Sequence, residues 1–243
     1  MAIKKRLKLG WKSLWKFIKI TVLTMFLSSL VYIFICKWVN PPITITQMTN
    51  SIHFGIYQES VPWKQISYNV KLAALASEDQ TFLEHGGFDW DAIERSLKPP
   101  KKGRKAKHPP GFGASTISQQ VAKNVFLWQG TGWTRYVRKV PEMYFTKMIE
   151  WFWGKQRIME VYLNVIEMGP GIFGIEAAAQ SNFNKHASQL SEEQAAKIVA
   201  CFPNPKRFFV AHPISKRVIW RYPQIIREMN NLRDDEDVAD FLK

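Results

Sequence analysis

The sequence predicts a mainly α-helical protein in which one membrane-spanning helix precedes a single helical domain. Apolar residues recur at helical spacing along most of the chain after residue 65, whereas alternating strand patterns are scarce. An uncharged run at residues 20–36 is close to the length of a membrane span. Hydrophobic residues make up 46% of the 243 residues, so the chain is not a disordered polyelectrolyte.

The formal charge of +14 is concentrated in two blocks. Residues 1–19 hold seven basic residues and no acidic one, and residues 98–108 hold six basic residues. The rest of the chain carries a formal charge of about +1. A nucleic-acid-binding domain is expected to spread its basic residues over one face. The two blocks therefore disfavour nucleic acid as a partner.

The uncharged segment 20–36 follows the first basic block directly. At ~1.5 Å per residue it spans roughly 25 Å, and its flanking residues complete a ~30 Å hydrocarbon core. We therefore predict a transmembrane helix over residues 17–38. A signal peptide and a buried core helix are the alternatives, but the run is long for a signal sequence and no small-residue cleavage site follows it. The basic residues before the helix predict that segment 1–19 is cytoplasmic and that the domain lies outside.

After the anchor, Pro41 and Pro42 oppose helix continuation. Residues 39–64 are predicted to form an extended linker, with 43–46 as the best strand candidate. Residues 65–243 then form one domain. Its helix candidates are 69–87, 115–127, 134–154, 155–169, 191–202 and 215–232. Their expected N-terminal caps include Asn69, Ser115 and a capping box of Ser191 with Gln194.

Carboxylates and large apolar residues are interleaved in "SEDQTFLEHGGFDWDAI", residues 77–93. Glu78 and Asp79 are expected near the C-terminal end of their helix, where the macrodipole opposes negative charge. Packed among apolar neighbours, Glu78 would have a raised pKa that suits a general base. The alternative is that these carboxylates lie on a solvent-exposed polar face of the helix. This segment, taken alone, favours that alternative.

Two further segments carry polar residues at helical spacing. In "GFGASTISQQVAKN", residues 111–124, glycines precede a Ser/Thr-capped helix start of the kind that binds anions, although ordinary capping explains the same pattern. In "RKVPEMYF", residues 138–145, Arg138 and Glu142 form an i, i+4 pair. Pro141 between them is expected to kink the helix or to start a new one.

These segments, with "RIMEVYLNVIEMGPGIFGIEAAAQSNFNK" and the weaker "CFPNPKRFFVAHP", resemble the motifs of the peptidoglycan glycosyltransferase family in order and spacing. The match covers about residues 65–215. Two departures are visible: Ala114 stands where the family usually has glycine, and Pro141 directly precedes the motif Glu142. Neither removes a titratable group. One anchor without a following penicillin-binding domain resembles the monofunctional, membrane-anchored form.

The resemblance implies a lysozyme-like fold and polymerisation of peptidoglycan. The lipid-linked growing chain would be transferred to the 4-hydroxyl of lipid II, releasing undecaprenyl diphosphate and forming β-1,4 linkages. Glu78 would be the catalytic base and Glu142 the second catalytic carboxylate, which either holds Mg²⁺ or Mn²⁺ on the diphosphate or orients Arg138. No organic cofactor is expected. The implied substrate-binding residues are Asp79, Phe82, His85, Ser115, Thr116, Gln120, Lys123, Asn124, Arg138 and Lys139.

The same resemblance implies a place in the bacterial inner membrane, with the catalytic domain in the periplasm. Membrane lipids and other cell-wall or division proteins are the expected further partners. The basic block 98–108 either grips anionic head groups or is a solvated loop. Trp128, Trp133, Trp151 and Trp153 either enter the bilayer or pack in the core. Two other functions stay open: a lytic enzyme of similar fold, and a non-catalytic scaffold that recruits wall-building proteins.

Overall fold

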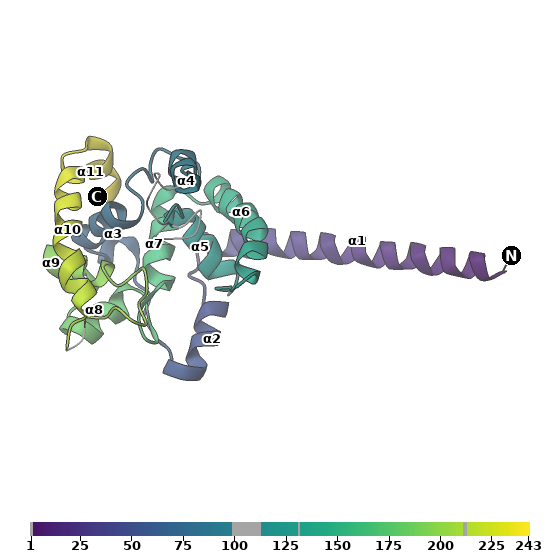
Figure 1. The fold of residues 1–243 in the computed structure, drawn as a ribbon, viewed down its shortest axis with the longest axis horizontal. Helices are drawn as coiled ribbons and strands as arrows, with labels where there is room; N and C mark the ends of the chain where they lie inside the picture. The colour runs from purple at the N-terminus through teal and green to yellow at the C-terminus, as the bar shows by residue number, and fades with distance from the viewer. Residues whose placement is uncertain (1, 99–112, 131, 211–212) are drawn as a thin grey trace. The chain divides into compact units, whose positions relative to one another are not determined.

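The computed structural model describes residues 2–98, 113–130, 132–210 and 213–243 (Figure 1). It contains two compact units, residues 1–39 and 40–243, which are described separately. The described residues are mainly helical, which confirms the predicted fold class. Except for Lys98, the basic block 98–108 lies outside the described residues, and so does Gly111.

The first unit is helix α1, Ala2–Cys36. Its part Trp11–Cys36 has a mean hydropathy of 2.1 and is the one span among the described residues that is long and apolar enough to cross a membrane. Apolar side chains along it are exposed, among them Phe17, Met25 and Phe34. A helix that exposes such side chains fits a lipid environment better than water. The helix ends two residues before the predicted boundary at residue 38.

The second unit is built from two groups of packed helices. Helix α3 (Tyr68–Glu78) packs against α9 (Glu192–Val199) and α10 (Lys216–Arg233). Helix α5 (Ile117–Phe126) packs against α6 (Thr134–Phe152) and α7 (Lys155–Val165). Leu72, Ile117 and Ile158 from these helices are fully buried. The two groups meet where the Gln120 amide on α5 donates a hydrogen bond to Glu78 at the C-terminal end of α3.

A small three-stranded sheet, in the order β1-β3-β2, completes the unit. Strand β1 (Tyr57–Gln58) is parallel to β3 (Ile172–Phe173), and β2 (Glu167–Gly169) is antiparallel to β3. Gly171, at φ +71°, lies where a Cβ atom would meet the Phe54 carbonyl oxygen at 2.7 Å, so only glycine fits this turn. The remaining elements are η1 (Trp63–Gln65), α4 (Trp90–Leu97), α8 (Ile175–Phe183), η2 (Ala187–Gln189) and α11 (Glu236–Leu242).

The stretch expected to be extended contains helix α2, Ile45–Phe54. Thr44 and Gln47 form a capping box at its start, which satisfies the free N–H groups of the first turn. The helix packs against α5, and the Gln129 amide donates to the Thr46 hydroxyl at 3.3 Å. The expectation of a strand at residues 43–46 is therefore wrong, because the β-branched residues there serve as a helix cap and first turn.

Several helix boundaries also differ from expectation. Helix α7 ends at Val165 instead of residue 169, because residues 167–169 form strand β2. The cap of α3 is Ser67 rather than Asn69, and α3 ends at Glu78 instead of continuing to Gly87. The cap of α5 is Thr116 rather than Ser115. Helix α6 runs through Pro141 without a new start. The predicted capping box of Ser191 with Gln194 is confirmed.

The apolar stripe of α6 faces outward. Val137 and Val140 are exposed, the latter at 74%, whereas Arg138, Glu142 and Thr146 are buried at i, i+4 and i+8. Polar side chains on the inner face of a helix require partners there. This inversion of the usual pattern marks the inner face of α6 as the wall of a polar site.

Candidate active site

The Glu78 carboxylate is at the C-terminal end of α3 and is half-buried. One carboxylate oxygen accepts a hydrogen bond of 2.9 Å from the Gln120 amide on α5, and the other faces the Ser77 hydroxyl at 3.4 Å. Burial raises the pKa of Glu78, while the bonds from Gln120 and Ser77 and the charges of Arg221 and Lys123 oppose this rise. The result is a carboxylate with few hydrogen bonds and a raised affinity for a proton, as a general base requires.

Asp79 joins the end of α3 to the start of α5. One of its oxygens accepts the backbone N–H of Ile117 at 2.9 Å, and the carboxylate lies 3.0 Å from the Nε2 atom of His85. The other ring nitrogen of His85 accepts the backbone N–H of Gly87 at 3.1 Å. Asp79 and His85 therefore fix the position of the base relative to α5, and their predicted contact with substrate stays a prediction.

Thr116 does not face the cavity described below. Its buried hydroxyl donates to the Gly87 carbonyl oxygen at 2.8 Å and accepts the N–H of Gln119, so it is fully used in capping α5. The predicted contact of this hydroxyl with substrate is therefore not supported by its position. Ser115, one residue earlier, lines the cavity instead.

Phe82 belongs to the core behind the site. It is fully buried against Phe241 and His85, and the Lys155 ammonium lies 4.4 Å from its ring centroid. The structure therefore places Phe82 under the turn that follows Glu78, where it supports the turn by packing. Lys155 reaches over this ring to the His85 carbonyl oxygen at 2.6 Å.

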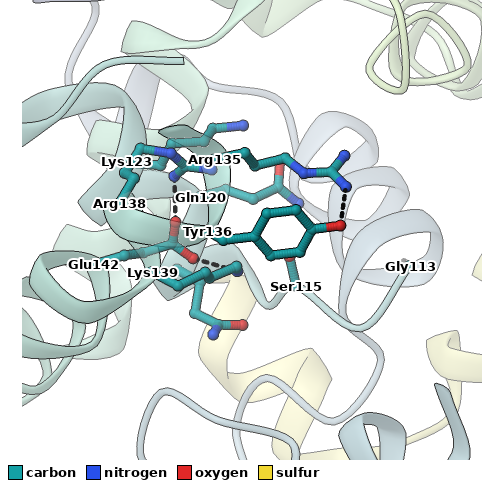
Figure 2. A pocket seen from close by; sticks show the side chains of 10 residues that line it. Gly113, Ser115, Gln120, Lys123, Arg135, Tyr136, Arg138, Lys139 and Glu142 are labelled. Carbon is teal, nitrogen blue, oxygen red and sulfur yellow. Dashed lines mark hydrogen bonds and ion pairs between the residues drawn. The ribbon is translucent and has the colours of Figure 1, made fainter. Parts of the chain in front are cut away.

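A buried ion pair lies on the inner face of α6. Arg138 and Glu142 are 4% and 2% exposed, and one Nη atom of Arg138 bonds one carboxylate oxygen of Glu142. Lys139 bonds the other oxygen at 2.5 Å. Figure 2 shows both bonds converging on the carboxylate. The Nε atom of Arg138 is buried without a partner among the described residues, so this guanidinium keeps a free donor.

A cavity of about 410 Å³ lies between α5 and α6, and Figure 2 shows the side chains that line it. Four of the side chains that line it are cationic, and Glu142 is the only carboxylate among them. The lining residues are Gly113, Ser115, Gln119, Gln120, Lys123, Arg135, Tyr136, Arg138, Lys139 and Glu142. A cavity with this excess of positive charge suits a ligand with more than one negative charge, and guanidinium groups bind phosphate oxygens in pairs.

Lys123 lies between the base and the ion pair. Burial, together with the charges of Arg138 and Lys139, lowers its pKa to about 8, while Glu142 and Glu78 oppose this fall. Lys123 and Gln120 also line a second cavity of about 270 Å³, with Asn124 and Lys206 among its other walls. The Asn124 oxygen accepts from Gln129 at 3.0 Å. The two cavities thus meet at Gln120 and Lys123, beside Glu78.

The sequence pattern missed several residues of this site. Arg135 and Tyr136 line the larger cavity, and the Arg135 guanidinium lies 3.4 Å from the Tyr136 hydroxyl. Both occupy the first turn of α6, before the quoted motif that starts at Arg138. Tyr162 is not among the expected site residues either, yet its hydroxyl donates to Gln120 at 3.3 Å.

The carboxylate of Glu142 does not fit a metal site in this arrangement. Both of its oxygens are held by cationic side chains, and no three His, Cys, Asp or Glu side chains are grouped for a metal in the parts of the chain that the structure describes. A divalent cation needs several free oxygen ligands. Of the two roles expected for Glu142, the ion pair supports the orientation of Arg138.

Gly87 is expected to be irreplaceable in the turn that follows Glu78, where its carbonyl oxygen accepts a hydrogen bond from Thr116 at the start of α5. Its φ is +93°, and a Cβ atom would meet the Thr146 methyl group at 2.7 Å. Gly87→Ala should lower the free energy of unfolding by about 1–2 kcal/mol from backbone strain alone, and by more from the contact with Thr146. Gly86→Ala is the matched control, because its Cβ would have only the Lys147 ammonium at 3.6 Å. Equal thermal melting of the two variants would contradict the prediction.

A carboxylate beside a cationic cavity in a helical domain suits an enzyme that binds an anionic ligand. The chain matches the Transglycosylase family over residues 46–230. It is 44% identical over 226 residues to a biosynthetic peptidoglycan transglycosylase of Bdellovibrio bacteriovorus, covering 90% of this chain and 87% of that protein. Proteins of the same name from Pseudomonas syringae pv. tomato and Pasteurella multocida are 41% and 43% identical, over 86% of this chain and 87% and 84% of theirs. The chain belongs to the transglycosylase family, which confirms the resemblance seen in its motifs.

Proposed function

We propose that the enzyme transfers a lipid-linked glycan chain to the 4-hydroxyl of lipid II, releases undecaprenyl diphosphate and forms a β-1,4 bond. It is a transglycosylase that polymerises the glycan strands of peptidoglycan. The observation that carries the finer proposal is the position of Glu78 beside Gln120 and Lys123, where two cavities meet.

In this mechanism Glu78 accepts the proton of the attacking hydroxyl. A sugar hydroxyl is a weak nucleophile until a base takes its proton during the attack. The raised pKa of Glu78 makes it a stronger base than a solvated carboxylate. Attack on an α-linked donor from the opposite side inverts the anomeric carbon and gives the β linkage.

The departing diphosphate requires positive charge rather than a proton. Lys123 and Arg138 line the larger cavity together with Lys139 and Arg135, and they neutralise the charge that develops as the bond breaks. Glu142 holds Arg138 and Lys139 in place. Ser115 and Gln120 contact the sugar or phosphate oxygens, and Asn124 does so from the second cavity. No step requires a metal ion held by the protein.

We further propose that α1 anchors the enzyme in the bacterial inner membrane with the domain in the periplasm. Trp133, directly before α6, and Trp151 on α6 are largely exposed and suit contact with the bilayer, whereas Trp153 is buried in the core. Such contacts would bring the site close to a substrate that stays in the membrane. Protease added outside spheroplasts should remove the domain, and full protection of the domain would contradict this orientation.

The function is tested with the full-length protein in detergent. With lipid II we expect glycan polymer, and with finished glycan strands no cleavage. Release of fragments from finished strands would favour the alternative of a lytic enzyme. A chelator should leave most of the polymerisation rate, because the cationic side chains of the cavity neutralise the diphosphate. If the chelator abolishes polymerisation and added Mg²⁺ or Mn²⁺ restores it, a divalent cation is needed.

A further inference from the structure

Lys155 and Glu150 form an ion pair behind the turn that follows Glu78. The Lys155 ammonium lies 2.8 Å from one carboxylate oxygen of Glu150, and the two side chains are 21% and 9% exposed. Lys155 is the first residue of α7, and Glu150 lies in the last turn of α6. Neither side chain lines the two cavities beside the base. The pair is therefore not placed to contact a substrate bound in those cavities.

Each member of the pair has a second polar partner. The hydroxyl of Ser118 on α5 is fully buried and donates to the same oxygen of Glu150. The Lys155 ammonium also donates to the His85 carbonyl oxygen at 2.6 Å. The pair thereby connects the start of α5 to the turn that carries His85.

This connection returns to α5 through the side chains of His85 and Asp79. The Nδ1 atom of His85 accepts the backbone N–H of Gly87, so Nε2 carries the ring proton and donates to the Asp79 carboxylate at 3.0 Å. Asp79 in turn accepts the backbone N–H of Ile117 at 2.9 Å. The hydrogen bonds thus begin at Ser118 and end at the adjacent residue Ile117, which makes a closed ring.

The turn also packs closely against the members of this ring. Phe82 is fully buried, and its ring centroid lies 4.4 Å from the Lys155 ammonium and 6.3 Å from the ring centroid of His85. At Gly87 a Cβ atom would lie 3.0 Å from the Cγ atom of Glu150. Hydrogen bonds in such buried surroundings are stronger than in water. Polar bonds and packing therefore act together on the turn.

We propose that Lys155 and Glu150 are positioning residues that hold the turn after Glu78 against the start of α5. The proposal rests on the proposed role of Glu78 as the base. Neither residue touches the reacting groups. Both act through the ring of hydrogen bonds, which fixes where the base stands.

The ring reaches the base through its neighbours in the sequence and in space. Asp79 directly follows Glu78, and Gln120, which donates to the Glu78 carboxylate at 2.9 Å, lies one turn after Ile117 on α5. Tying Asp79 to Ile117 therefore fixes the carboxylate relative to the amide. A misplacement of about 1 Å can cost about 10²-fold in rate. Loosening the ring should lower kcat and leave KM nearly unchanged, because the cavities that would hold the substrates keep their walls.

The test is to measure kcat and KM of lipid II polymerisation by the full-length enzyme. Removing one charge alone would leave the other buried without its partner, so Glu150→Gln is combined with Lys155→Met. The amide keeps an acceptor for Ser118, whereas the His85 carbonyl oxygen loses its donor. We expect kcat to fall roughly tenfold, with KM changed less than about twofold and the melting temperature nearly unchanged.

Lys147→Met is the matched control. Lys147 also donates to a carbonyl oxygen of this turn, that of Gly86, at 2.8 Å. No hydrogen bond of the ring passes through it. Its replacement should change kcat less than about twofold, as is usual for a substitution near the surface.

If the double variant does not fold, Ser118→Ala tests the proposal, because it breaks only the link from Glu150 to α5. It should lower kcat about threefold at an unchanged KM, which corresponds to the loss of one hydrogen bond. An unchanged kcat in the folded variants, equal losses in Lys147→Met and the double variant, or a rise in KM at an unchanged kcat would overturn the proposal. Failure of the base assignment looks different, because Glu78→Gln itself would then keep its activity.

Discussion

Replacing Glu78 by Gln is expected to lower the rate of lipid II polymerisation by roughly 10²–10⁴-fold, the usual contribution of a general base. The amide has nearly the same shape as the carboxylate, and its oxygen can still accept the hydrogen bond from Gln120. It cannot take a proton from the sugar hydroxyl. The fold should stay intact, and the melting temperature should be unchanged or slightly higher because a partly buried charge is lost.

The measurement is the initial rate of polymer formation at a pH on the plateau, with thermal melting of the same preparation. Ser77→Ala is the matched control. Its hydroxyl faces the same carboxylate at 3.4 Å, too long for a strong bond, so its removal should change the rate less than about threefold. A Glu78→Gln enzyme that polymerises at the wild-type rate would remove the base from the mechanism.

The sequence predicted the helical class and most of the helices, because apolar spacing records which face of a helix is buried. It failed where local and tertiary preferences compete. The β-branched residues at 43–46 suggested a strand. The capping box of Thr44 with Gln47 and the packing of α2 on α5 stabilise a helix there instead. Helix α3 ends at Glu78, where the chain turns so that Asp79 can cap α5.

The site was predictable only where motif residues carry the chemistry themselves. Glu78, Gln120 and Lys123 are brought together as the resemblance implied. Arg135 and Tyr136 could not be found in this way, because no local pattern reveals that the first turn of α6 lines the cavity. Thr116 misled for the opposite reason: the hydroxyl that marks the helix start is consumed by its own cap and by Gly87. A cap and an anion site look alike in sequence because both use the free N–H groups of the first turn.

The second large effect is expected at the ion pair of Arg138 and Glu142. Glu142→Leu alone leaves the Arg138 charge buried without its main partner, and breaking a buried pair in this way lowers the free energy of unfolding by about 3–5 kcal/mol. Replacing both, as Arg138→Met with Glu142→Leu, removes both charges and should restore most of this loss, because well-packed apolar residues often substitute for a buried pair. Polymerisation should nevertheless stay at least ~10²-fold below wild type, since the cavity loses a cation that the diphosphate needs.

Denaturant unfolding and lipid II polymerisation of the three proteins therefore separate the contributions of the pair to stability and to catalysis. The exposed pair of Asp240 and Lys243 at the end of α11 provides the control. Its double replacement by Leu and Met should leave the unfolding free energy nearly unchanged and leave the rate unchanged. If the Arg138/Glu142 double variant were stable and fully active, the pair would have no catalytic role. If it were as unstable as the single variant, the pair would be needed for the fold itself. Recovered stability without recovered activity is the result expected of a buried ion pair that serves catalysis rather than stability.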